Sequence, residues 1–169
     1  MTTEVAAADW IRRIADDERR RDALRLQEEE TVARKTELVR LNGRRLLDEL
    51  RAVVARDVEA FRREFAGDDS RNIALDTTGA SGGFVVRKPA SQAVTLTATV
   101  HLETAAMDCH YQFTSTNGLP PREERVELVF AAEGADTLQV KTQRTGQVFA
   151  SADALSEYLL GPVFTGRPR

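Results

Sequence analysis

The sequence predicts an α+β fold: a long N-terminal helix packed on a curved antiparallel sheet of five or six strands, with a short C-terminal helix. Three observations predict it. Residues 3–65 contain no proline and a single glycine, Gly43. Apolar and polar residues alternate from residue 94 to residue 114, and an apolar segment follows Ser151. Strand alternation with short connections is typical of an antiparallel meander that has one buried face.

The N-terminal helical tract is longer than the rest of the chain can cover. At about 1.5 Å per residue, a helix over residues 3–65 would be roughly 90 Å long. The remaining hundred or so residues would form a domain only about 30–35 Å across. We therefore expect a helical arm over residues 1–43, and a helix-on-sheet domain over residues 44–169.

The predicted arm is rich in charge but carries scattered apolar side chains that nothing else in the chain covers. Burial against a second copy would cover them, so we expect a dimer or a larger homo-oligomer. No clean heptad runs through the arm, so pairing of two arms and docking of an arm on another subunit's domain are both open. The expected oligomer interface contains Trp10, Ile11, Ile14, Leu24 and Val32.

The second half of the helical tract has a wide apolar face. Apolar residues recur there at steps of three and four, which indicates a helix that packs on a sheet. Asn42 and Gly43 mark the junction with the arm, either as a tolerated glycine in a continuous helix or as a kink or turn. The apolar face consists of Leu47, Leu50, Val54, Val58, Phe61 and Phe65.

The strands and the last helix follow in order. Two early strand candidates lie at 72–76 and 83–88, the two clearest strands lie within 94–114, and shorter candidates follow at 126–130, 138–140 and 147–149. Ser151 is placed to cap the last helix, and Gly161-Pro162 is expected to end it.

Composition excludes several classes of protein. The net charge is −3 and residues 1–66 contain 15 acidic and 15 basic residues, so no basic patch predicts a nucleic-acid partner. No apolar run reaches the 18 or so residues that a membrane span needs. A single cysteine, Cys109, cannot form an internal disulfide. The first residues do not resemble a signal peptide, so we expect a cytoplasmic protein, and the excess of arginine over lysine suggests a bacterial genome rich in G and C.

One group of side chains could carry chemistry. If Leu102 pairs with Cys109 across a hairpin at Ala105-Ala106, His101 faces His110 and Glu103 faces Asp108 on the exposed side of the sheet. Two imidazoles and two carboxylates could hold a divalent metal, although a solvated polar surface is the far more common arrangement. We expect the two histidines to face each other and to bind no metal specifically. Cys109 falls among inward-facing residues and is expected to be a core residue.

The sequence therefore contains no motif that commits it to an activity, and no cofactor is predicted. The leading hypothesis is a non-enzymatic binding or scaffold protein that self-associates through its N-terminal helix, with a protein or peptide partner as a further option. A small-molecule or lipid carrier with a cavity between residues 44–66 and the sheet is one alternative. A small metal-dependent hydrolase that uses His101 and His110 is the other.

Overall fold

A computed structural model describes residues 2–79, 82–89, 93–114, 118–133 and 137–169. The chain is divided into two compact units, Met1–Glu37 and Leu38–Arg169. Helix α1 (Thr2–Glu64) contributes to both and is continuous through Asn42 and Gly43, which is the first of the two alternatives left open by the sequence. A Cβ at Gly43 would lie 3.0 Å from Leu102 Cδ2, so the glycine permits close packing.

The part of α1 in Met1–Glu37 has a highly charged surface. Ion pairs one turn apart follow one another along it, including Asp16–Arg19 at 2.8 Å and Glu18–Arg21 at 2.9 Å. These pairs are exposed, so each adds only a few tenths of a kcal/mol to helix stability. Most of the pairs in this part of the helix are at a spacing of three residues.

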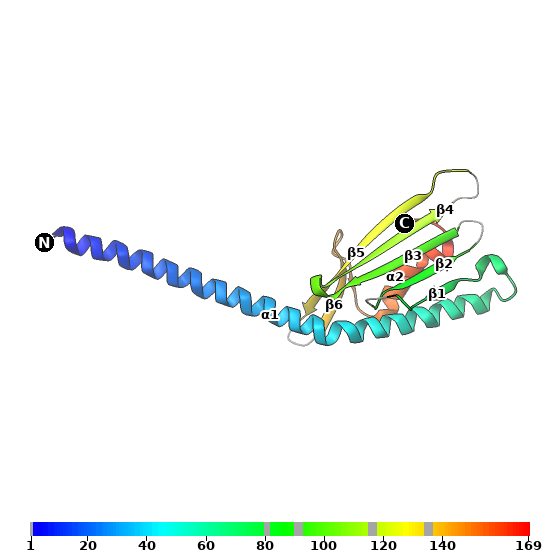
Figure 1. Ribbon diagram of the computed structural model, residues 1–169, viewed down its shortest axis with the longest axis horizontal. Coiled ribbons are helices and arrows are strands. Elements are labelled where there is room, and N and C mark those ends of the chain that lie inside the picture. Colours follow the sequence, from blue (N-terminus) through cyan, green and yellow to red (C-terminus); the bar gives the residue numbers. More distant parts are fainter. Residues whose placement is uncertain (1, 80–81, 90–92, 115–117, 134–136) are drawn as a thin grey trace. The chain divides into compact units, whose positions relative to one another are not determined.

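The sheet of the second unit has seven antiparallel strands in simple meander order (Figure 1). The number of strands is slightly higher than the predicted five or six. The short edge strands at 74–76 and 148–149 account for the higher number, and both lie within segments that the sequence had offered as strand candidates. The strands are β1 (Ala74–Asp76), β2 (Phe84–Lys88), β3 (Ala93–His101), β4 (Ala106–Thr114), β5 (Arg122–Glu133), β6 (Thr137–Thr142) and β7 (Val148–Phe149).

The predicted alternation of buried and exposed residues is confirmed on the central strands. On β3 the inward residues are Val94, Leu96, Ala98 and Val100, each at most 3 % exposed. The inward residues of β4 are Met107, Cys109, Tyr111 and Phe113. They form one core with Leu47, Leu50, Val54 and Val58 of α1, so the predicted apolar face of that helix is buried as far as Val58.

Helix α2 (Ala152–Thr165) is buried on two sides. Toward the sheet, the Tyr111 hydroxyl donates a 2.6 Å hydrogen bond to the Leu159 carbonyl. Toward α1, the Ser156 hydroxyl donates a 2.7 Å hydrogen bond to Asp57 Oδ2. A helix that contacts neighbours on both sides needs apolar residues around most of its surface, which explains the apolar composition of this segment.

The C-terminal end of α2 differs from the sequence expectation. Ser151 caps the helix as predicted, because its hydroxyl accepts a 3.1 Å hydrogen bond from the Ala154 amide. The helix then continues through Pro162 to Thr165 and ends at Gly166, which has a φ of 70°. Burial of Val163 in the core offsets the hydrogen bond that proline cannot donate.

Candidate functional site

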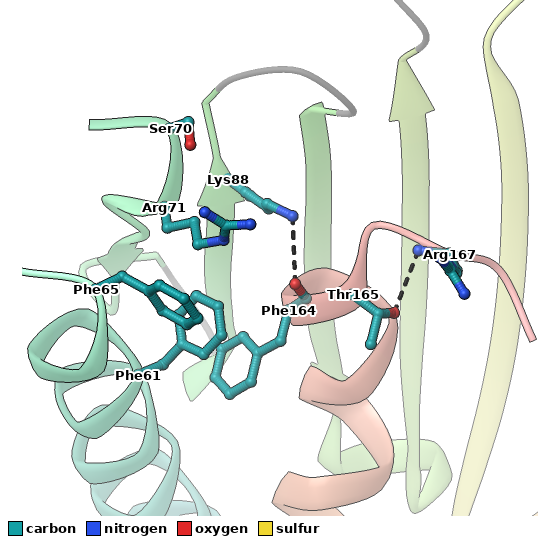
Figure 2. Close-up of a pocket in the computed structure, with 8 residues that line it drawn as sticks. All are labelled: Phe61, Phe65, Ser70, Arg71, Lys88, Phe164, Thr165 and Arg167. Atoms are coloured by element: carbon teal, nitrogen blue, oxygen red, sulfur yellow. Dashed lines mark hydrogen bonds between the residues drawn. The ribbon is translucent and has the colours of Figure 1, made fainter. Parts of the chain in front are cut away.

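A pocket of about 410 Å³ opens within the second unit, beside the C-terminal end of α1 (Figure 2). Four separate segments of the chain build it: the end of α1, the short 3₁₀ helix η1 (Asp69–Arg71), the end of β2 and the end of α2. Its lining consists of three phenyl rings, three cationic residues and two hydroxyl residues: Phe61, Phe65, Phe164, Arg71, Lys88, Arg167, Ser70 and Thr165.

The three phenyl rings form a continuous apolar wall. Phe61 stacks on Phe164, with ring centroids 4.2 Å apart and planes inclined by 14°. Phe65 lies against Phe61 with centroids 5.0 Å apart. Phe61 is partly buried and packs against the core, whereas Phe65 is 38 % exposed, so the predicted buried face of the helix does not extend to Phe65. The last turn of α1 instead faces the end of α2 and the pocket.

Lys88 is a lysine on the core-facing side of a strand. It follows the buried residues Phe84 and Val86 at a spacing of two, and it is itself only 9 % exposed. Its Nζ donates a 3.2 Å hydrogen bond to the Phe164 carbonyl in the last turn of α2 (Figure 2). Burial lowers the pKa of Lys88, and the positive charge of Arg71 lowers it further. No carboxylate of a described residue pairs with Lys88.

Arg71 is held at the rim of the same pocket. Its guanidinium donates a hydrogen bond to Asp68 Oδ2 and lies over the Phe65 ring, 4.6 Å from the centroid. Asp68 also accepts a 3.0 Å hydrogen bond from the Ser70 amide. Hydrogen bonds from Ser70 and then from Arg71 lower the pKa of Asp68, so this carboxylate stays ionised. Asp68 and the Phe65 ring thus orient the Arg71 side chain. The hydrogen bond to Asp68 uses only one of the guanidinium nitrogens, Nη1.

The lining of the pocket combines cationic, hydroxyl and apolar groups. It holds no histidine, cysteine, aspartate or glutamate. Arginine and lysine hold anions well, and three adjacent phenyl rings provide an apolar contact surface. The combination is suited to a molecule with one anionic group and an apolar body.

The predicted pairing of the histidines was wrong. Residues Leu102–Thr104 form a short 3₁₀ helix, and Ala105 adopts the left-handed conformation with a φ of 53°. This turn is longer than expected and shifts the register of the hairpin. His101 therefore pairs with Ala106, and His110 pairs with Thr97.

Three of the four candidate metal ligands, His101, Asp108 and His110, line one pocket, and Glu103 is not part of its lining. Asp108 pairs with Thr99 in the ladder, and Glu103 lies in the 3₁₀ turn. His101 Nε2 is 3.3 Å from Asp108 Oδ2. His110 Nε2 is 3.4 Å from Glu123 Oε2, within ion-pair range but without the geometry of a hydrogen bond. Within the described ranges, no three side chains of the metal-binding types converge on one point.

The residues predicted as an oligomer interface are all exposed on α1. Trp10, Ile11 and Ile14 are 51–53 % exposed, Leu24 is 59 % exposed and Val32 is 64 % exposed. They all belong to Met1–Glu37. By contrast, Leu38 and Val39, which the sequence analysis had assigned to the arm, are buried in the second unit.

Searches for related proteins leave the site to be interpreted from its own geometry. No family model matches the chain, and neither curated proteins nor solved structures gave a match. Among the described residues, no helix combines the length and the apolar character that a membrane span requires.

The sequence analysis missed the pocket, although one signal was available. A lysine at the inward position after Phe84 and Val86 breaks the apolar side of β2, and a buried lysine is unusual enough to indicate a special role. Arg71 and Phe164 carried no comparable signal, because both reach the pocket only through the fold.

Proposed function

We propose that this chain is a non-enzymatic binding or scaffold protein that self-associates through the N-terminal part of α1. The observation that carries the proposal is the exposure of its large apolar side chains, from 51 % at Trp10 to 64 % at Val32. Scattered single apolar residues are normal on protein surfaces. Several of them on one side of one helix are better explained by a partner that covers that side.

The positions of these side chains favour a defined face. Ile14 and Val32 are 18 residues apart, which is five helical turns, so they point in the same direction. Ile11 and Trp10 flank Ile14 within one turn of the helix. Between the two apolar ends, pairs such as Asp22–Arg25 at 3.7 Å support the helix without a partner. In the assembly that we propose, the helix presents this face to a second copy.

The assembly can be tested with charge substitutions on and off this face. We expect the full chain to sediment as a dimer or larger species at micromolar concentration, and Ile14→Glu combined with Val32→Glu to sediment near 18.8 kDa. Leu26→Glu is a matched control, because Leu26 is also exposed, at 55 %, but points roughly 120° away from Ile14.

Sedimentation equilibrium gives a direct answer. An unsubstituted chain that remains a monomer at tens of micromolar would contradict the proposal. Dissociation by Leu26→Glu as complete as that by Ile14→Glu combined with Val32→Glu would show that the contact is not confined to the face of Ile14 and Val32. Circular dichroism of each variant checks that the helix is retained.

A further inference from the structure

The pocket beside Phe61 contains two cations that the fold does not fully use. The Phe164 carbonyl in the last turn of α2 accepts one hydrogen bond from Lys88 Nζ, which helps to cap that helix. An ammonium group has three N–H donors, so two remain. It costs free energy to keep the largely buried Lys88 ammonium charged without a carboxylate partner. The single hydrogen bond that caps α2 does not require that charge.

Arg71 adds a second cation to the same pocket. Its charge acts on Lys88, and both side chains line the cavity with the three phenyl rings (Figure 2). Arg167 is a third cationic residue of the lining, and Asp68, which is bonded to Arg71, is the acid next to it. The positive charges of this site therefore exceed the negative ones, and an anion would balance them.

We propose that this pocket binds a small amphipathic organic anion, a carboxylate on an aryl or aryl-alkyl body. The carboxylate lies between Arg71 and Lys88, and the apolar body lies against Phe61, Phe65 and Phe164. This inference goes beyond self-association, and it gives a place and a ligand class to the carrier function that the sequence left open.

The geometry favours a small carboxylate for two reasons. A guanidinium fork and an ammonium group together match the two oxygens of a carboxylate. The volume of about 410 Å³ is in the range of small-molecule pockets, and it suits one aromatic ring with a short chain better than a long lipid. The stacked pair Phe61–Phe164, with centroids 4.2 Å apart, presents ring surface to such a body.

Isothermal titration of the full chain with 3-phenylpropionate tests the proposal. We expect one site per chain, and much weaker binding of the neutral alcohol 3-phenylpropan-1-ol, which has the same body. Inorganic phosphate, which lacks the apolar body, should not compete at equal concentration. Loss of a hydrogen bond to a charged group should weaken 3-phenylpropionate binding roughly tenfold or more in Arg71→Gln and in Lys88→Met.

The variants are chosen so that folding and binding can be separated. Lys88→Met keeps the apolar stem of the side chain, and Arg71→Gln alters a residue whose side chain is 44 % exposed. Lys141→Met, on β6 and outside the pocket lining, is the control and should bind as the unsubstituted chain does. If Lys88→Met fails to fold, Arg71→Gln decides the question.

Three results would overturn the assignment: no heat of binding at millimolar 3-phenylpropionate, equal binding of the alcohol, or unchanged affinity in Arg71→Gln. A Lys88→Met chain that is less stable but binds the carboxylate as tightly as before would show that Lys88 serves only as a helix cap, and would also overturn it. None of these results depends on the oligomeric state of the chain.

Discussion

Cys109 and Tyr111 are buried on the core-facing side of β4, where burial disfavours ionisation. Burial, together with a smaller effect of the Asp108 charge, raises the pKa of the Cys109 thiol from 9.0 to about 12. Burial likewise raises the pKa of Tyr111. Thiolate chemistry needs an accessible group with a low pKa, so Cys109 is a core residue, as its position in the alternating pattern had indicated.

This burial predicts both thiol reactivity and alkaline stability. With dithionitrobenzoate at pH 8, we expect no reaction of the native chain and one thiol per chain after denaturation.

Between pH 9 and about pH 12 the unfolded thiol loses its proton while the folded thiol keeps it. The free energy of unfolding should therefore fall as the pH rises through this interval. In Cys109→Ala the free energy of unfolding should fall less steeply over the same pH interval. Rapid labelling of the native chain by dithionitrobenzoate would show that Cys109 is not a core residue.

At the scale of single elements, the alternation of buried and exposed residues along a strand was easier to predict than the pairing of residues between strands. The alternation on β3 and β4 identified the buried residues because one face of the sheet packs on the core. The pairing of the strands depended on the turn between them, where Ala105 takes a left-handed conformation that alanine seldom adopts. Nothing in the sequence indicated this conformation, so the predicted contact of His101 with His110 was wrong.

The α1 segment of the second unit allows a graded test of burial. Leu50→Ala should lower the free energy of unfolding by about 2–5 kcal/mol, because Leu50 is 1 % exposed. Phe61→Ala should cost less, about 1–3 kcal/mol, because Phe61 is only partly buried. Arg62→Ala, on the outer side, should stay within about 0.5 kcal/mol.

Urea denaturation of the three variants measures these differences. The order Leu50, Phe61, Arg62 is the result expected from the burial of each side chain. A larger loss for Phe61→Ala than for Leu50→Ala would show that the stacked pair Phe61–Phe164 carries more of the stability than its exposure suggests.

At the scale of the whole molecule, the pocket depends on segments that are distant in the sequence. Phe164 can stack on Phe61 only because α2 continues beyond Pro162. A sequence reading that ends the helix at that proline leaves Phe164 in a tail. Leu160 and Val163 are buried, and their packing in the core stabilises α2 beyond Pro162. Local helix propensity could not predict this continuation. The sheet and core were predictable from periodicity, and the site was not.

The division of the chain into Met1–Glu37 and Leu38–Arg169 predicts how truncations behave. Removing residues 1–37 should give a folded monomer whose free energy of unfolding is close to that of the full chain measured at low concentration. Removing residues 1–41 should be clearly more damaging, because Leu38 and Val39 are 9 % and 2 % exposed. The burial of each contributes about 1.5–3 kcal/mol.

Urea denaturation and sedimentation of both truncated chains measure the two effects. Equal stability of the two would place the boundary beyond residue 41, in agreement with the arm over residues 1–43 that the sequence had suggested. A truncated chain of residues 38–169 that still forms dimers would instead place the assembly surface on the sheet domain.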